Sequence, residues 1–144
     1  MITLEHVSKT FTTKSGYVHA VRDVSLQINE GEIYGIIGFS GAGKSTLVRC
    51  INLLERPEAG NVTVDGRELL KLDASQLRES RKKIGMIFQH FNLMRLRTVA
   101  QNVAFPLKKS GLSKEEIARK VKELLELVDL SEKANVYPSQ LSGG

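Results

Sequence analysis

Residues 38–45 read Gly-Phe-Ser-Gly-Ala-Gly-Lys-Ser and lie between an apolar run and a segment with helical periodicity. They match the pattern G-x-x-x-x-G-K-[ST], whose glycines allow successive backbone N–H groups to turn toward one anion. In such a loop, Lys44 places a positive charge on the β- and γ-phosphates and the Ser45 hydroxyl completes a Mg²⁺ shell. A dinucleotide loop of the type G-x-G-x-x-G is disfavoured, because its third glycine would fall at Thr46. The pattern predicts a site for a Mg-nucleoside triphosphate.

The residues on either side of this loop predict a parallel α/β core. The run Ile33–Ile37 is short and β-branched, as in a strand buried on both faces. From Lys44 to Glu55 the apolar residues fall at helical spacing, with Cys50 among the core positions and Pro57 beyond the end. A second apolar strand is expected over residues 84–88, ending at Gln89.

The N-terminal part predicts an antiparallel lobe. Apolar residues at 2, 4 and 7 indicate one strand, and those at 24, 26 and 28 alternate with polar residues in another. Residues 60–66 alternate between two glycines, which is typical of a short strand followed by a turn.

The remaining segments favour helices. Residues 74–83 predict a polar helix, and residues 98–109 a helix that Pro106 ends or kinks. Ser113 and Glu116 form a capping-box pattern at the start of the next helix. Its apolar stripe comprises Ile117, Val121, Leu124, Leu125 and Val128. On its outer face, Glu115 and Glu116 stand four residues before Arg119 and Lys120, a spacing that favours ion pairs.

Composition restricts the class of protein. Hydrophobic residues make up 41% of the chain and charged residues 26%, which is sufficient for a folded core. A length of 144 residues is enough for one domain and too short for two of ordinary size. One cysteine and three separated histidines show no zinc-ligand spacing. We expect neither a membrane-spanning helix nor a signal peptide, because no apolar run has the required length.

The net charge of +5 lies wholly in the second half of the chain. Residues 1–72 hold 8 basic and 8 acidic residues, whereas residues 73–144 hold 13 and 8. Between residues 78 and 97 only Glu79 opposes a basic set comprising Arg78, Arg81, Lys82, Lys83, Arg95 and Arg97. Such a set suits nucleic acid, an anionic membrane surface, an acidic partner or simply a solvated face.

Three further features occur in a fixed order around the phosphate-binding pattern. Phe11 precedes it, Gln89 ends the second apolar run, and Leu-Ser-Gly-Gly at 141–144 follows Tyr-Pro-Ser-Gln. With these features the whole chain resembles the ATP-binding subunits of ABC transporters. Residues 34–57 and 84–93 look most like the ATPases of methionine importers, and importers of polar amino acids share much of these stretches.

The resemblance implies a set of site residues. ATP would be bound by Phe11, Gly38, Phe39, Ser40, Gly41, Ala42, Gly43, Lys44, Ser45 and Thr46. Phe11 would stack on the adenine, with Tyr17 as the alternative, and Thr46 would contact the α-phosphate. Lys44 and Gln89 would be catalytic, with Ser45 and Gln89 at Mg²⁺. Leu141, Ser142, Gly143 and Gly144 would act in trans on the ATP of a second copy.

The same resemblance implies partners and a location. It predicts an ATP-sandwich homodimer, a transmembrane permease subunit contacted near residues 90–105 through Met94 and Leu96, and indirect cooperation with a solute-binding protein. The protein would lie peripherally on the cytoplasmic face of the cell membrane, with no nucleic acid bound. The alternative is a soluble ABC ATPase that acts on nucleic acid or ribosomes.

The expected fold is an α/β P-loop NTPase core of the ABC type with an antiparallel β lobe and the start of a helical subdomain, truncated. The β lobe and phosphate loop would cover about residues 1–90 and the helical signature subdomain about 91–144. No apolar strand followed by Asp-Glu and no matching switch His is present in these 144 residues. We therefore expect these 144 residues to be part of a longer subunit, which is an ABC-type ATPase that drives transport by ATP-dependent dimerisation and hydrolysis. On their own, the 144 residues should bind ATP with little or no hydrolysis.

Overall fold

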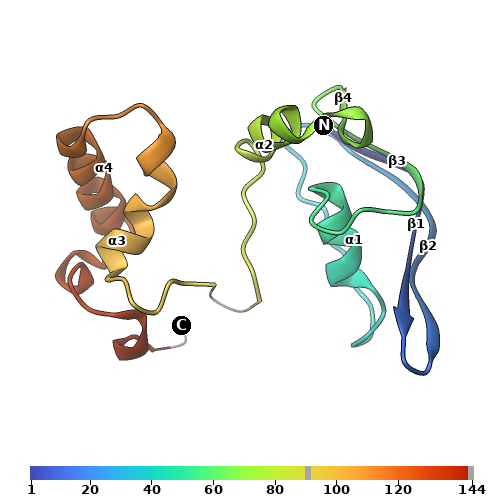
Figure 1. The fold of residues 1–144 in the computed structure, drawn as a ribbon, viewed down its shortest axis with the longest axis horizontal. Helices are drawn as coiled ribbons and strands as arrows, with labels where there is room; N and C mark the ends of the chain where they lie inside the picture. Colours follow the sequence, from blue (N-terminus) through green and yellow to red (C-terminus); the bar gives the residue numbers. More distant parts are fainter. Residues whose placement is uncertain (90–91, 143–144) are drawn as a thin grey trace. The chain divides into compact units, whose positions relative to one another are not determined.

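The structure is a computed structural model that describes residues 1–89 and 92–142. The chain divides into two compact units, Met1–Met86 and Ile87–Gly144 (Figure 1). Each unit has its own cluster of buried apolar side chains, and each is described by itself.

The first unit is built on an antiparallel sheet with the strand order β2-β1-β3-β4. Strand β1 (Ile2–Thr13) pairs with β2 (Gly16–Ile28) on one side and with β3 (Ala59–Val64) on the other, and β4 (Arg67–Glu68) completes the sheet. Leu4 lies opposite Leu26 and Val62, so the alternating apolar residues of the three strands share one face. The antiparallel lobe and the short strand with its turn are thus confirmed.

Helix α1 (Lys44–Ile51) contributes to the core that covers this sheet. The buried residues of the core are Leu4, Val7, Val21, Leu47, Cys50, Ile51, Leu53, Val62, Val64 and Leu69. Cys50 is fully buried, which confirms its predicted place, and burial raises the pKa of its thiol. The helix is shorter than expected and ends at Ile51 rather than Glu55, because Leu53 adopts a left-handed φ of 53°.

Helix α2 (Ala74–Arg81) follows a 3₁₀ turn, η1 (Leu69–Lys71), and confirms the predicted polar helix. Asp73 caps it by accepting the N–H groups of Ser75 and Gln76, both at 2.8 Å. At its other end, Arg81 donates from Nε to the carbonyl of Asn52 at 2.8 Å and from Nη2 to that of Leu53 at 2.7 Å. A guanidinium therefore satisfies the carbonyls just beyond the C-terminal end of α1.

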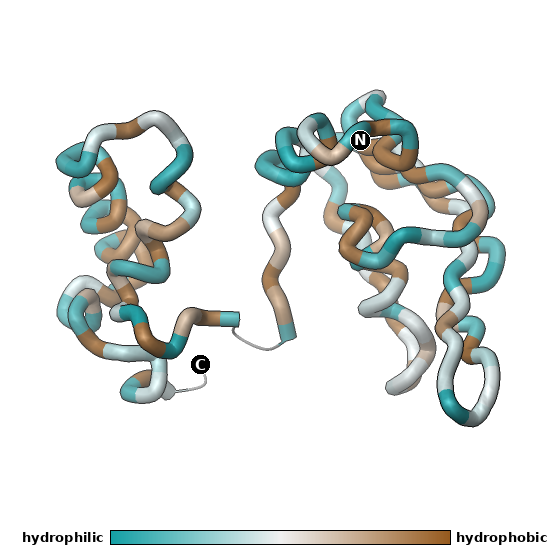
Figure 2. The backbone as a smooth tube through the Cα atoms, viewed as in Figure 1, coloured by the Kyte–Doolittle hydropathy of each residue, from teal (hydrophilic) through white to brown (hydrophobic). Residues whose placement is uncertain are grey.

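Two apolar segments predicted as buried strands are not strands in the structure. Residues 32–39 and 84–88 form no ladder with any described segment, and Ile33, Ile37 and Ile87 are almost fully exposed. Only one side of each segment is covered, since Ile36 and Ile84 pack against the core. The β-branched and apolar composition of the two segments favours an extended backbone. A strand also requires a neighbouring strand with which it can exchange hydrogen bonds. Figure 2 shows the second segment as a hydrophobic stretch of chain before residue 90.

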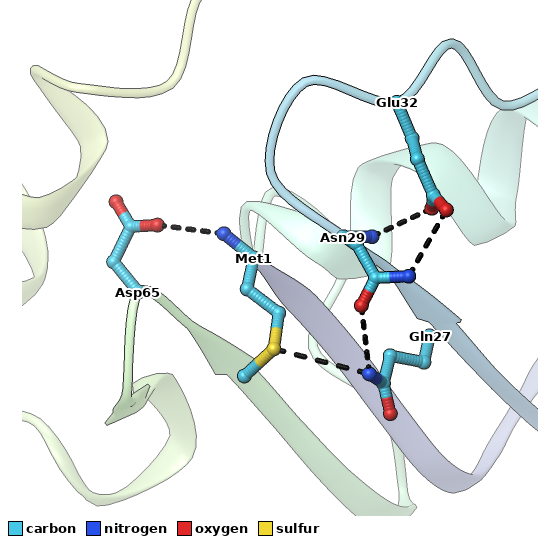
Figure 3. A network of polar contacts seen from close by, with 5 residues as sticks. All are labelled: Met1, Gln27, Asn29, Glu32 and Asp65. Carbon is cyan, nitrogen blue, oxygen red and sulfur yellow. Dashed lines mark hydrogen bonds and ion pairs between the residues drawn. The ribbon is translucent and has the colours of Figure 1, made fainter.

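A polar network holds the end of β2 and the start of β1 (Figure 3). The Met1 ammonium donates to Asp65 at 3.0 Å, and Gln27 donates to the side-chain oxygen of Asn29 at 2.9 Å. Glu32 accepts from the backbone and side-chain N–H groups of Asn29, at 2.7 and 3.0 Å. These two hydrogen bonds lower the pKa of Glu32, the side-chain bond having the larger effect, and they close the turn after β2.

The second unit is helical in its described part. It contains α3 (Val99–Ala104), the 3₁₀ turn η2 (Pro106–Lys109), α4 (Lys114–Leu127), η3 (Ser131–Lys133) and η4 (Pro138–Gln140). Val99, Val121 and Leu125 form its buried centre. The predicted break at Pro106 and the Ser113–Glu116 capping box are both confirmed.

Two expectations for α4 are wrong. Leu124 and Val128 are exposed, and the stripe that packs inward is Ile117, Val121 and Leu125. The described ion pairs on the outer face join Arg119 to Glu123 and Lys122 to Glu126, not the pairs expected from the first turn. The Glu116 carboxylate instead accepts the Ser113 N–H at 2.7 Å in the capping box, and Arg119 is paired with Glu123.

Within residues 1–89 and 92–142, no helix combines the length and the apolar character that crossing a bilayer requires.

Replacing Arg81 with Met tests the contact between α2 and the end of α1. R81M keeps an apolar stem and removes both hydrogen bonds, so we expect a loss of roughly 1.5–3 kcal/mol in the free energy of unfolding. Urea unfolding followed by labelling of Cys50, the single cysteine, reports on this unit alone. The matched control is K82M, whose exposed ion pair with Glu79 contributes at most about 0.5 kcal/mol. Equal midpoints for R81M and K82M would contradict the assignment.

Candidate functional site

The loop before α1 is held against the sheet at one glycine. Gly43 is the N-cap of α1, with φ 86° and ψ 2°, a left-handed conformation that glycine adopts without strain. A Cβ on Gly43 would lie 1.9 Å from the carbonyl oxygen of Ala20 in β2, so no side chain fits there. The position of Gly43 therefore fixes where α1 begins relative to β2.

The lysine of the motif is held by the loop itself. The Lys44 ammonium donates to the carbonyl oxygens of Gly38 and Phe39, both at 2.7 Å. Ala42 closes the loop by donating its N–H to the same Phe39 carbonyl at 3.2 Å. The loop thus surrounds a positive charge, which is the arrangement that a polyphosphate requires.

The start of α1 has free hydrogen-bond donors. Within the described residues, the N–H groups of Gly43, Lys44, Ser45 and Thr46 have no protein acceptor. Unpaired N–H groups and the positive end of the helix dipole favour an anion at this end of a helix. Ser45 is exposed in the first turn, where its hydroxyl is available to a cation bound with the anion. The residues present therefore fit a phosphate group and a Mg²⁺ ion.

A cavity of about 410 Å³ lies beside the loop. Its lining includes Gly41–Lys44, Ile36 and Ile37, together with His19, Arg22 and other residues of β2. Sequence reasoning missed His19, Arg22 and the contact of Ala20 with Gly43. No local pattern signals them, because the proximity of β2 to the loop is a tertiary feature.

The two proposed base-stacking residues differ in exposure. Phe11 lies in β1 opposite Val18 and is partly buried, whereas Tyr17 is 75% exposed at the start of β2. Within the motif, Phe39 is 92% exposed, Ser40 is exposed and Thr46 is partly buried. Phe11 is therefore the better-defined stacking surface of the two.

The remaining predicted site residues belong to the second unit. Gln89 and Ser142 are exposed, and Leu141 packs against the cluster centred on Val99, Val121 and Leu125. Gly143 and Gly144 lie outside the described residues. Among the described residues, no group of three or more His, Cys, Asp and Glu side chains is arranged to bind a metal ion.

Some cations of the basic set between residues 78 and 97 have contacts within their own unit. Arg81 is bonded to the end of α1, and Lys82 pairs with Glu79 at 2.7 Å. In the second unit, the guanidinium of Arg97 lies over the Phe105 ring, 4.9 Å from its centroid. Of these three contacts, only that of Lys82 pairs a cation with a carboxylate, and Arg81 and Arg97 keep their positive charge.

Comparison with known families agrees with this geometry. The model of the family described as "ABC transporter" matches residues 21–144, which include the phosphate loop, Gln89 and the Leu-Ser-Gly-Gly segment. The chain belongs to the ABC transporter family. The expected fold class is confirmed by two solved structures of the ATP-binding cassette MJ0796, one a dimer in a post-hydrolysis state bound to ADP and Pi. Each has a TM-score of 0.90, is 38% or 39% identical, and is matched over 99% of this chain and 64% of its own.

Curated relatives are similar over the whole of this chain. The chain is 58% identical to the methionine import ATP-binding protein MetN of Desulfitobacterium hafniense and 61% identical to that of Lacticaseibacillus paracasei. It is 60% identical to MetN 1 of Enterococcus faecalis. These identities confirm the resemblance to the ATPases of methionine importers. The chain spans 40–42% of the length of these three relatives.

A pair of glycine substitutions tests the contact between the loop and β2. Gly41 and Gly43 have similar positive φ angles, 80° and 86°, but only at Gly43 would a Cβ meet the Ala20 carbonyl. We expect G41A to lower the free energy of unfolding by about 1 kcal/mol through backbone strain alone. G43A should lower it by more than about 3 kcal/mol, because the loop must also move away from the strand. Cys50 labelling in urea measures both, and equal losses would refute the close contact.

Proposed function

We propose that this chain is the ATP-binding part of the energy-coupling subunit of an ABC importer, and that it binds Mg-ATP at the loop 38–46. The observation that carries the proposal is the position of the Lys44 ammonium, 2.7 Å from two loop carbonyls, beside the free N–H groups that start α1. Positive charge and unpaired donors converge on one concave backbone segment, which matches the chemistry of a polyphosphate.

Individual residues would divide the work of holding the nucleotide. Lys44 would contact the β- and γ-phosphates, the free N–H groups of residues 43–46 would surround the phosphate oxygens, and Thr46 would contact the α-phosphate. Ser45 and Gln89 would hold Mg²⁺, which neutralises charge on the β- and γ-phosphates when bound. Phe11 would stack on the adenine, since a partly exposed ring on the sheet offers a face that accepts a base.

The relatives suggest the transported solute. They are methionine import ATP-binding proteins at 58–61% identity, so we infer that the solute is methionine, with a polar amino acid as the alternative. The partners would be a transmembrane permease, a second copy of this chain and, indirectly, a solute-binding protein. The protein would then sit peripherally on the cytoplasmic face of the cell membrane.

The segment before α3 is a candidate contact for the permease. The amide of Asn102 donates to the carbonyls of Met94, Arg97 and Thr98, and its oxygen accepts the Met94 N–H at 2.8 Å. Leu96, within this braced segment, is 93% exposed. A rigid backbone that presents an apolar side chain to solvent is suited to contact a partner helix.

The second copy would be joined through ATP. In this proposal, Leu141, Ser142, Gly143 and Gly144 of one copy cover the γ-phosphate bound by the loop of the other. The dimeric cassette structures at 38–39% identity support this arrangement. Binding of ATP would favour the joined state and its loss the separated state, which is the population shift that transport requires.

Hydrolysis by these 144 residues alone should be slow. Activation of the attacking water needs a positioned base in addition to charge stabilisation, and the sequence holds no apolar strand followed by Asp-Glu. A steady-state ATPase assay should therefore give a turnover far below one per second. A turnover of about one per second would contradict this part of the proposal.

Equilibrium titration with Mg-ATP tests the site. We expect saturable binding by the wild-type chain and at least a hundredfold weaker binding by K44A, since the substitution removes a charge-assisted contact to the phosphates. K82A is the matched control, because it removes an exposed lysine that pairs with Glu79 outside the loop. Unchanged affinity in K44A, with a circular dichroism spectrum like that of the wild type, would overturn the proposed site.

A further inference from the structure

A cation, an anion and an aromatic ring form a cluster in the first unit. The Lys9 ammonium lies 5.2 Å from the centroid of the Phe11 ring and 3.9 Å from Oε1 of Glu58. The same Glu58 oxygen accepts the Thr10 N–H at 3.1 Å. The Lys9 side chain is only 17% exposed, so its position is restricted by its surroundings.

The cluster lies on the side of the sheet that carries the phosphate loop. Lys9 and Phe11 are two residues apart in β1 and so point to the same face. Lys9 is also near Cys50 of α1: burial raises the pKa of that thiol, and the Lys9 charge acts in the opposite direction. Helix α1 covers this face and begins at the loop, so Phe11 and the loop share one side of the sheet.

Phe11 and the loop are also close along the strands. Phe11 pairs with Val18 in β2, and the Ala20 carbonyl that excludes a side chain at Gly43 lies two residues farther along β2. Two residues of a strand span at most roughly 7 Å, and here Ala20 lies at a shift in register between the pairs Lys9–Val21 and Thr10–His19. A ligand that binds the loop through phosphate can therefore extend along β2 toward the Phe11 ring.

Glu58 connects the ring to the far end of α1. It belongs to the connection that leads from α1 to β3, and its N–H donates to the Ser8 carbonyl at 2.9 Å. Pro57, its neighbour, is buried. Glu58 is thus fixed by its backbone on β1 and by its side chain on Thr10 and Lys9.

We propose that Lys9, held by Glu58, is a positioning residue that fixes the Phe11 ring for the base of the bound nucleotide. This inference rests on the proposed function, since it assigns a role within the same ATP site. Lys9 occupies one face of the ring by a cation–π contact, and the opposite face of the partly exposed ring receives the base. The negative charge of Glu58 would keep the Lys9 ammonium over the ring when phosphates bind in the loop.

The test compares two ligands that share the phosphates and differ in the base. Mg-ATP and inorganic tripolyphosphate are titrated into the wild-type chain and into K9M, K9R, E58Q and F11A. K9M should bind Mg-ATP about three- to tenfold more weakly, the range that a partly desolvated cation–π contact supports. Its affinity for tripolyphosphate should stay within about twofold of the wild type, because the loop itself is unchanged. K9R should restore Mg-ATP binding, because an arginine retains the cation over the ring.

E58Q separates the two functions of Glu58. Glutamine can still accept the Thr10 N–H but no longer attracts Lys9, so Mg-ATP binding should weaken by less than in K9M. F11A sets the maximum effect, since it removes the stacking surface itself. Because the chain has no tryptophan, F11W supplies a single tryptophan fluorophore. ATP should quench its fluorescence less in the double variant K9M/F11W than in F11W.

Each contrary result has a distinct meaning. Unchanged Mg-ATP affinity in K9M beside a weakened F11A would overturn the role of Lys9 and leave the proposed function intact. Equal weakening of both ligands in K9M would also overturn it, since the effect would then not concern the base. If F11A binds Mg-ATP like the wild type, base stacking on Phe11 is wrong and the role of Lys9 falls with it. If the wild-type chain binds neither ligand, the proposed function itself is refuted.

Discussion

The contact between Gly43 and the Ala20 carbonyl is the constraint on which the rest of the first unit depends. It leaves no room for a side chain, so it fixes the first residue of α1 against β2. From that point α1 buries Leu47, Cys50 and Ile51 in the core, and Arg81 satisfies the carbonyls beyond its end. The helix that follows the loop is therefore held at both ends, and Gly41–Lys44 line one cavity beside it. An anion site in which the donors are already oriented loses little entropy when a polyphosphate binds.

Local patterns in the sequence predict the elements whose stability is local. The β1–β2 lobe follows from alternation, and the capping box at Ser113 follows from two residues, Ser113 and Glu116. The motif of the phosphate loop is equally local, since it consists of glycine spacing and one lysine, although the contact that holds the loop against β2 is not. These features require no knowledge of distant contacts, and the sequence was sufficient for each of them.

The features that the sequence did not predict depend on distant neighbours. Ile33–Ile37 and residues 84–88 have strand-forming composition but no ladder within the described residues, because pairing is decided by another segment. In α4 the capping box engages Glu116, and Arg119 pairs with Glu123 one turn later. The positions of Ala20 and His19 beside the loop come from strand register, and the position of Glu58 beside Thr10 comes from the connection after α1. No pattern within a few residues of each of them contains that information.

The most direct test follows the backbone amide resonances of the ¹⁵N-labelled chain while Mg-ATP is added. If the loop is the polyphosphate site, the largest shifts should occur at residues 43–46, whose free N–H groups would gain phosphate acceptors, with smaller shifts at Phe11 and Val18 beside the base. Residues of α4 should not move, because that helix holds no residue of the proposed site. Shifts centred outside residues 38–46, or saturation with no change at Gly43 and Lys44, would contradict the account.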